Sequence, residues 1–375
     1  MINGFKLDKD VKILIKDFKF FYFYNSLNSI PMKSIALTGI GKMGMIQEPD
    51  PVILNETDVI VKVTHVGVCG SDMHLYEEGH IGDNWVEYPF VVGHEGTGII
   101  EQAGTGVSHV KPGDRIAIEP AQSCGKCDQC LAGRPHTCRK LIFLGSPGQA
   151  VGILSEKIII PGHCCFPLPD NLSNDRACLA EPLSISIWAV DLAGLTPDSN
   201  IAILGSGPIG MCVLLYARQQ GVKNTYVTDK IDDRLAMAEK AGAGWTGNPD
   251  RQDIVCLINE EEPLGLDCIF DCCGKQEAVD QAVELLKPGG KIMIVGIPEF
   301  DNWSFATDKT RRKEVCIQNV RRQNKRLQKA IDLIADGRVN TDLLVTHRFS
   351  FPRTNEAFDL VNDYRDGVMK ALIQF

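Results

Sequence analysis

The chain divides into two stretches by the spacing of its hydrophobic and polar residues. From residue 32 to about 184, short β-rich runs such as 58–63 and 98–101 are separated by glycine and proline, and long helical patterns are few. This pattern predicts a mainly β domain. From about 185 to 320, short apolar runs alternate with helical patterns, which indicates an α/β domain built on a parallel sheet.

The second stretch predicts the individual elements of that sheet. Strands are expected at 201–204, 226–228, 268–270, 291–295 and 315–318. A helix is predicted from Arg326 to Ala335, and the tail through 345–349 is expected to return to the first domain. We therefore expect a catalytic domain of residues 32–184 and 321–375, a cofactor domain of residues 185–320, and a ligand cleft between them.

A first group of candidate metal ligands lies in separate segments of the chain. Cys69 opens Cys-Gly-Ser-Asp-Met-His, His94 and Glu95 lie in Gly-His-Glu-Gly, and Glu181 lies in Ala-Glu-Pro-Leu. Thiolate, imidazole and carboxylate suit zinc, and a catalytic zinc has three protein ligands and an open position. Such a zinc activates an alcohol. For Cys69 or His94 alone, the alternative is a buried, hydrogen-bonded core residue.

A second group of cysteines is closely spaced. Cys124, Cys127, Cys130 and Cys138 lie in a short lobe rich in glycine, proline and charge. Four thiolates without an open position predict a structural zinc, and the alternative is a pair of disulfides. The chain has fourteen cysteines. Others in apolar runs are expected in the core, namely Cys164, Cys165, Cys212, Cys256, Cys268, Cys272 and Cys273.

A dinucleotide fingerprint follows the first predicted strand of the second stretch. The apolar run leads into Gly-Ser-Gly-Pro-Ile-Gly (205–210) and then a helical pattern, and a second strand ends at Asp229. The glycines allow a pyrophosphate to approach the backbone, while Asp229 can bind a ribose 2′-hydroxyl and would repel a 2′-phosphate. This favours NAD over NADP, although an ordinary tight turn is the alternative. The expected cofactor-binding residues are Gly205, Gly207, Pro208, Ile209, Gly210, Asp229 and Arg234.

Composition narrows the class of protein. A length of 375 residues and a hydrophobic content of 44% suit two cores, and the net charge of −9 argues against nucleic acid as a partner. No apolar stretch reaches the roughly 20 residues that a transmembrane helix needs, so we expect a soluble, cytoplasmic protein without a membrane partner. Residues 1–31 lack the features of a signal peptide. They are expected to be a disordered extension read from an upstream start, and a short targeting segment is the alternative.

Together these motifs resemble the zinc-dependent medium-chain alcohol dehydrogenases, and most of all their sorbitol (polyol) dehydrogenase branch. The resemblance covers residues 32–375 and includes Glu-Pro-Leu-Ser (181–184) and Val-Thr-His-Arg-Phe (345–349). It implies a GroES-like catalytic domain and a Rossmann domain with a doubly wound parallel sheet. Alcohol dehydrogenases proper carry a cysteine where this chain has Glu181, whereas a glutamate there is similar to polyol dehydrogenases.

The resemblance also implies roles for single residues. Zinc would be held by Cys69, His94 and Glu95, with Glu181 either a fourth ligand or joined to the zinc through a water molecule. Ser71 would take the proton of the substrate hydroxyl and pass it through His74 to solvent; without the resemblance, an N-cap and a surface imidazole are the alternatives. Asp72 is expected to orient the ligands.

The expected substrate and cofactors follow from the same resemblance. Arg322 matches the substrate-binding arginine of the family, but the tyrosine after it in animal sorbitol dehydrogenases is Gln323 here. The tyrosine expected after His74 is Leu75, followed by Tyr76. We expect two zinc ions per chain, NAD, a polyol or sugar alcohol substrate, and a homodimer or homotetramer. A diol, threonine or aldose dehydrogenase is the alternative among enzymes. The alternative outside the enzymes is a zinc-containing protein that binds a dinucleotide without catalysis.

Overall fold

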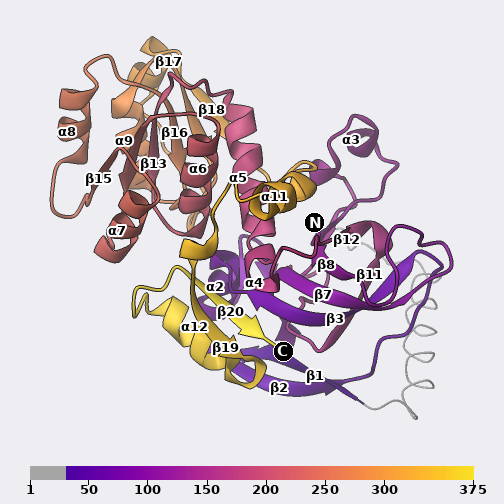
Figure 1. The fold of residues 1–375 in the computed structure, drawn as a ribbon. Coiled ribbons are helices and arrows are strands. Elements are labelled where there is room, and N and C mark those ends of the chain that lie inside the picture. The colour runs from indigo at the N-terminus through magenta and orange to yellow at the C-terminus, as the bar shows by residue number, and fades with distance from the viewer. Residues whose placement is uncertain (1–30) are drawn as a thin grey trace, which may run out of the picture.

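The computed structural model describes residues 31–375, which form two sheet-based halves with helix α5 (Ala180–Ala193) running between them (Figure 1). The predicted extension lies outside the described residues, apart from residue 31. No helix within the described range combines the length and the apolar composition that crossing a membrane requires.

The first half is built on a seven-stranded sheet in the order β12-β8-β7-β3-β20-β19, with β11 also paired to β3. β11 and β20 share one edge of β3 at its opposite ends, and β7 pairs along the other edge. The strands are β3 (Asp58–Gly67), β7 (Glu95–Ala103), β8 (Arg115–Ile118), β11 (Lys157–Pro161), β12 (Cys165–Pro167), β19 (Val345–Ser350) and β20 (Lys370–Gln374).

Smaller elements surround this sheet. A three-stranded sheet, β2-β1-β6, and two short strand pairs, β4-β5 and β9-β10, complete the β structure. Their bounds are β1 (Met32–Gly39), β2 (Lys42–Glu48), β4 (His80–Ile81), β5 (Asn84–Trp85), β6 (Phe90–Val91), β9 (Ala121–Gln122) and β10 (Ile142–Phe143). The short helices here are α2 (Gly70–Glu77), α3 (Asp128–Leu131) and α4 (Asn174–Ala177).

The second half contains a six-stranded parallel sheet in the order β15-β14-β13-β16-β17-β18. The strands are β13 (Asn200–Leu204), β14 (Asn224–Thr228), β15 (Trp245–Gly247), β16 (Leu266–Asp271), β17 (Leu286–Ile294) and β18 (Cys316–Asn319). The helices are α6 (Pro208–Gln219), α7 (Asp232–Lys240), α8 (Ile254–Glu261), α9 (Gln276–Leu285), α10 (Thr307–Arg312) and α11 (Leu327–Ala335). Strand order reverses between β13 and β16, where ligands of open α/β sheets bind.

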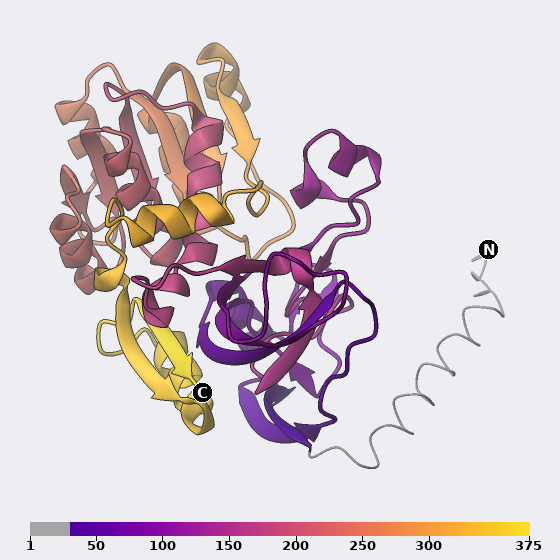
Figure 2. The same ribbon diagram turned by 45° about the vertical axis from the view of Figure 1, so that its right-hand side comes forward.

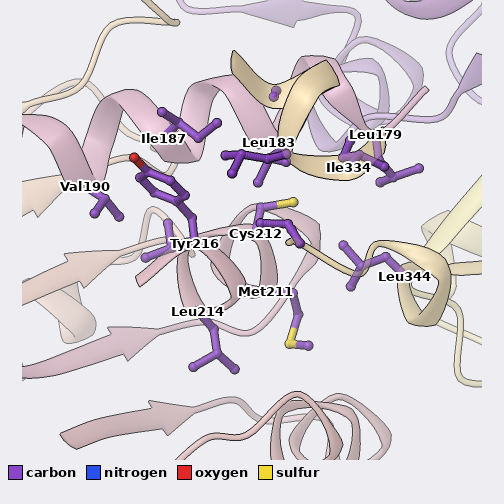
Figure 3. Close-up of a cluster of buried hydrophobic side chains, with 14 of the residues drawn as sticks. Leu179, Leu183, Ile187, Val190, Met211, Cys212, Leu214, Tyr216, Ile334 and Leu344 are labelled. Carbon is purple, nitrogen blue, oxygen red and sulfur yellow. The ribbon is translucent and has the colours of Figure 1, made fainter. Parts of the chain in front are cut away.

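Both faces of the parallel sheet are covered because its strand residues alternate in direction. Ile201 and Ile203 pack into a cluster with α5, α6 and α11, whereas Ala202 and Leu204 pack with α8 and α9. Figure 3 shows the first cluster, where Tyr216 of α6 lies beside residues of α5. Strands buried on both faces explain the short apolar runs of this stretch.

The C-terminal tail returns to the first half, as predicted. β19 and β20 extend the first sheet through the pairing of β20 with β3, and α12 (Thr354–Asn362) lies between them in sequence and packs beside β20. Figure 2 shows this segment in yellow, away from the parallel sheet.

The structure differs from the local predictions in three respects. β15 was not predicted, because it has only three residues and its alternation is too short to recognise. β17 begins at Leu286, earlier than expected, because Leu286 already pairs with Leu266 before the Pro-Gly-Gly segment at 288–290, where Gly289 has a φ of 79° and the register with β16 shifts. Among the cysteines expected in the core, Cys256 and Cys273 are exposed. Cys256 lies on the outer face of the amphipathic helix α8, and Cys273 lies in the loop after β16.

Candidate catalytic zinc site and cofactor site

Strand register brings the first group of ligand residues together. β3 and β7 pair so that Gly67 faces Glu95, and on the other edge of β3 Leu372 faces Gly67. Cys69 follows the end of β3 and His94 immediately precedes β7. Both residues therefore lie at the same end of the sheet.

Cys69, His94 and Glu95 form one cluster. A ligand atom of each lies within 4.8 Å of the others. Asp72 lies behind them: its Oδ1 is 3.5 Å from His94 Nδ1, and its Oδ2 accepts a hydrogen bond from the Cys69 N–H at 3.1 Å. Asp72 thus orients two candidate ligands and leaves Nε2 as the ring nitrogen of His94 that can face a metal.

The electrostatics of His94 agree with a cation site. Burial is the largest influence on the pKa of His94 and lowers it, but the negative charges of Asp72 and Cys69 raise the pKa well above its usual value overall. Thiolate, imidazole and carboxylate at this spacing suit zinc. The donor set fits the metal that the sequence predicts.

Helix α2 carries the expected proton path. Ser71 and His74 lie one turn apart, so they share a face of the helix. The Ser71 hydroxyl donates to the Sγ of Cys69 at 3.4 Å, and His74 is half-buried. Within residues 31–375 no direct hydrogen bond joins Ser71 to His74, so proton transfer between them needs an intervening group.

Tyr76 does not replace the tyrosine that the resemblance places after His74. Its hydroxyl oxygen lies 2.7 Å from Asp359 Oδ1 and 3.0 Å from the Gly41 carbonyl oxygen, and its single hydrogen can be donated to either acceptor. The ring packs tilted against Phe358 of α12, with centroids 5.6 Å apart. Tyr76 therefore belongs to the core of the first half.

Lys370 forms a buried ion pair with Glu95. Its Nζ donates to Oε1 and Oε2 of Glu95 at 2.9 and 2.7 Å and to the Val68 carbonyl at 3.0 Å. Each of the two side chains is 1% exposed. Negative charge on Glu95 and Cys69 outweighs burial and raises the pKa of Lys370. Glu95 thus has a cation partner within the protein besides any metal.

Glu181, the fourth predicted ligand, lies near this cluster but is not part of it. It is placed by the first turn of α5 and is buried. Burial is the main cause that raises the pKa of Glu181 to about 7, while the charge of His94 opposes the shift and that of Glu95 adds to it. A carboxylate in this position is easily neutralised by a proton and would be stabilised by a metal.

Arg322 is linked to this region through the ring of Phe143. Its guanidinium stacks over the ring of Phe143, 3.7 Å from the centroid, and that ring is 5.3 Å from the His94 ring. Burial, with the adjacent Arg321, lowers the pKa of Arg322 to about 9, and Glu181 opposes the shift. Nη1 of Arg322 is buried and has no acceptor among the described residues.

A second carboxyl group, that of the half-buried Glu119, was not predicted. It follows β8, and its Oε1 accepts a hydrogen bond from the Ala121 N–H at 3.1 Å while Oε2 accepts one from Gln323. Burial raises the pKa of Glu119 to about 8; the hydrogen bond from Ala121 opposes the shift and the charge of Glu181 adds to it. Glu119, Glu181 and Arg322 therefore interact electrostatically with one another, and Glu181 also interacts with His94 and Glu95 of the ligand cluster.

The second group of cysteines forms a separate cluster in the lobe that carries α3. One sulfur from each of Cys124, Cys127, Cys130 and Cys138 lies within 4.8 Å of the others. Cys127 Sγ is 3.6 Å from Cys130 Sγ and 3.8 Å from Cys138 Sγ. Sulfurs about 2.3 Å from a central zinc would be about 3.8 Å apart in a tetrahedron. The lobe fits a structural zinc.

Backbone amides support thiolates in this lobe. N–H groups of Cys130 and Arg139 lower the pKa of Cys127 to about 6, and those of Lys126 and Cys127 lower the pKa of Cys124. Zinc binds thiolates, so amides that favour deprotonation favour the metal.

The glycine loop between β13 and α6 has the geometry of a dinucleotide site. Gly205 has a φ of 97°, and a Cβ on Gly210 would lie 1.9 Å from the Gly205 carbonyl oxygen. Only glycine therefore allows α6 to start this close to the strand. Pro208 is the first residue of α6, and Ser186 donates to the carbonyl of Ile209 at 3.2 Å.

Asp229 closes this loop from the end of β14. Its Oδ2 accepts from the Ser206 N–H at 2.7 Å, and its Oδ1 accepts from the Ile231 N–H at 2.9 Å. Arg234 of α7 lies beside the loop, with its guanidinium 4.9 Å from the centroid of the Tyr364 ring. The residues predicted to bind the cofactor thus lie at one edge of the parallel sheet.

Comparison with known proteins identifies the family. An alcohol dehydrogenase GroES-like domain matches residues 55–170, and a zinc-binding dehydrogenase domain matches residues 208–336. The L-idonate 5-dehydrogenase of Vitis vinifera is 35% identical over 82% of this chain and 85% of its own length. The chain belongs to the zinc-dependent medium-chain dehydrogenases. This family makes it an oxidoreductase, as the resemblance indicated.

Two further relatives refine this placement. The sorbitol dehydrogenase of Bacillus subtilis (strain 168) is 34% identical over 85% of this medium-chain dehydrogenase and 91% of its own length. A structure described as a short chain alcohol dehydrogenase from Escherichia coli CFT073 with NADH has a TM-score of 0.84. It is 29% identical and covers 92% of this chain and 99% of its own. The predicted fold class, a GroES-like domain with a Rossmann domain, is confirmed.

Two residues of this dehydrogenase site were missed although the sequence carried a signal for each. Lys370 is the single charge in the apolar run 368–373, and a charge in a buried strand needs a partner. Glu119 directly follows the apolar run 116–118. Neither signal identifies the partner, which the tertiary structure alone supplies.

Proposed function

We propose that this chain oxidises a secondary hydroxyl of a polyol or sugar alcohol with NAD as hydride acceptor. The position of Glu181 carries this proposal: it is a buried carboxylate beside the Cys69–His94–Glu95 cluster, within electrostatic reach of Arg322. A pocket for a simple alcohol has no need of a buried carboxylate and guanidinium around the ligand cluster. A substrate with several hydroxyls could form hydrogen bonds with both groups.

The ligand roles extend this proposal. Cys69, His94 and Glu95 would hold the catalytic zinc, and Glu181 would ligate it directly or through a water molecule. Cys124, Cys127, Cys130 and Cys138 would hold the structural zinc. When bound, the catalytic zinc acts as a Lewis acid that lowers the pKa of the substrate hydroxyl.

The chain's own side chains would handle the proton and orient the substrate. Ser71 is placed next to Cys69, so its hydroxyl can accept the substrate proton, and His74 would pass it to solvent from the same face of α2. Arg322 would bind a hydroxyl remote from the reacting carbon through its unpaired Nη1.

The cofactor assignment rests on the glycine loop and Asp229. N–H groups at the start of α6 would bind the pyrophosphate, and the Asp229 carboxylate would accept a hydrogen bond from the ribose 2′-hydroxyl. Ile209 and Arg234 lie beside these groups. A 2′-phosphate would meet the charge of Asp229, which favours NAD.

An aldonate is a second candidate substrate. A buried guanidinium without an acceptor among the described residues could pair with a carboxylate as well as with a hydroxyl. One relative of comparable identity is named L-idonate 5-dehydrogenase. The polyol reading keeps precedence because Glu119 and Glu181 are carboxyl groups near Arg322, and their negative charge at a pH above their raised pKa values of about 8 and about 7 would oppose a carboxylate substrate.

A substrate panel tests the proposal. NADH formation would be measured with polyols, aldonates, diols, threonine, aldoses and 2-butanol. We expect the highest kcat/KM for a polyol, and Arg322→Ala should raise KM for that polyol while leaving 2-butanol nearly unchanged. A preference for threonine or for 2-butanol would overturn the polyol assignment.

Three wider expectations join the proposal. Residues 32–184 with 321–375 would form the catalytic domain and residues 185–320 the cofactor domain. Fourteen cysteines without a disulfide among them support a reducing, cytoplasmic location. A homodimer or homotetramer is expected, and its mass in solution would be measured by light scattering.

A further inference from the structure

We propose that Glu119 and Gln323 act as a pair of positioning residues that hold Arg322 at the substrate site. The inference rests on the proposed polyol function and adds two residues to it. Neither residue belongs to the zinc cluster, and in the sequence they are 204 positions apart. Their contact joins the end of β8 to the loop between β18 and α11.

The hydrogen bonds of this pair form a chain in which every acceptor has its own donor. Glu119 Oε1 accepts from the Ala121 N–H, and Oε2 accepts from the Gln323 amide. The oxygen of that amide accepts from the Arg326 N–H at 2.6 Å. Gln323 is buried, and so its amide would be costly to leave unpaired. The chain fastens the loop of residues 322–326 to the first sheet.

The backbone of Arg322 needs such support. Its φ is 50°, in the left-handed region that a non-glycine side chain rarely adopts. Such a conformation persists when neighbouring contacts determine it. The buried side chain of Gln323, the next residue, supplies those contacts.

The result is a guanidinium aimed beside the ligand cluster. Arg322 lies over Phe143, which in turn lies against His94, and Nη1 keeps a donor without an acceptor among the described residues. If the loop of residues 322–326 were mobile, Nη1 of Arg322 would occupy many positions. Holding it in one place lowers the entropy cost of binding a substrate hydroxyl.

Exchange of the two side chains tests the pair. In Glu119→Gln, the new amide must turn its oxygen to the Ala121 N–H, so its NH₂ faces the NH₂ of Gln323. In Gln323→Glu, two carboxylates face each other. The double variant Glu119→Gln/Gln323→Glu restores an amide donor opposite a carboxylate acceptor and keeps the acceptors for Ala121 and Arg326.

Kinetics would be measured for the best polyol and for 2-butanol at alkaline pH, above the pKa of about 8 for Glu119. Each single variant should raise KM for the polyol at least ~5-fold with kcat and the 2-butanol parameters within ~2-fold. The double variant should return KM to within ~2-fold of wild type. When Arg322→Ala is already present, adding Glu119→Gln should not raise KM for the polyol further.

Other outcomes overturn the inference. Equal losses for both substrates, an unrescued double variant, or an additive effect in the Arg322→Ala background would show a general structural role instead. A wild-type enzyme active on polyols with unaffected single variants would refute the pair alone. A wild-type enzyme inactive on every polyol would refute the proposed function and, with it, this inference.

Discussion

Lys370 donates hydrogen bonds to both carboxylate oxygens of Glu95, a residue 275 positions earlier in the chain. The pairing follows from β20 and β7 lying on the two sides of β3. It gives a predicted zinc ligand a second, permanent cation. The charge of Glu95 therefore has a partner even before a metal binds.

Breaking this ion pair should strongly destabilise the protein. Lys370→Met leaves a buried carboxylate without its partner, so we expect a loss of about 3–5 kcal/mol in the free energy of unfolding. Urea denaturation would measure it. The control is Lys157→Met, which removes a more exposed lysine from Asp50 and Glu101 and should cost about 0–1 kcal/mol. Similar losses of unfolding free energy in the two variants would contradict the assignment of Lys370 and Glu95 as a buried ion pair.

Purified protein should contain zinc at both cysteine-containing clusters. Elemental analysis is expected to find two zinc ions per chain, one of them removed by a chelator with loss of activity. Cys138→Ser should lose the resistant zinc and lower thermal stability. The matched control Cys178→Ser, at a buried cysteine outside both clusters, should keep both ions. One zinc in fully active enzyme would contradict this prediction.

Glu181 should make stability depend on pH once the catalytic zinc is removed. Its pKa rises from 4.5 to about 7 on folding, mainly through burial, so between these values the folded state binds more protons and stability falls as pH rises. The shift corresponds to about 3 kcal/mol.

The control for this prediction is Glu181→Gln, which does not titrate. Relative to this variant, the zinc-free wild type should lose about 3 kcal/mol between pH 4.5 and a pH above 7, measured by urea denaturation. Zinc should reduce the loss because a cation stabilises the carboxylate. If the unfolding free energies of wild type and Glu181→Gln differed by a constant amount across this pH range, Glu181 would not be desolvated.

Cofactor choice should depend on Asp229. Asp229→Ala with Ile231→Arg should shift the ratio of kcat/KM values toward NADP by at least ~10-fold, about 1.4 kcal/mol. Because Asp229 also accepts hydrogen bonds from Ser206 and Ile231, Asp229→Asn is the control for loss of loop support. A wild-type preference for NADP would contradict the assignment.

Local spacing in the sequence was enough for the cysteine lobe and the glycine loop. Cys124 to Cys138 and Gly205 to Gly210 are short segments whose own turns set their geometry, so residue type and spacing predict them. The parallel strands were also predicted, because burial on both faces requires continuous apolar runs. The exception, β15, is too short to show a pattern.

Contacts between distant segments required the tertiary structure. Glu95 meets Lys370 through the register of three strands, and Glu119 meets Gln323 because the loop before α11 folds onto the first sheet. A sequence shows that a buried charge must have a partner, since an unpaired charge is costly to bury. It does not show which partner, because strand register and loop packing depend on the whole chain. The metal motifs and Asp72 therefore followed from the sequence alone, whereas the contacts of Lys370 and Glu119 did not.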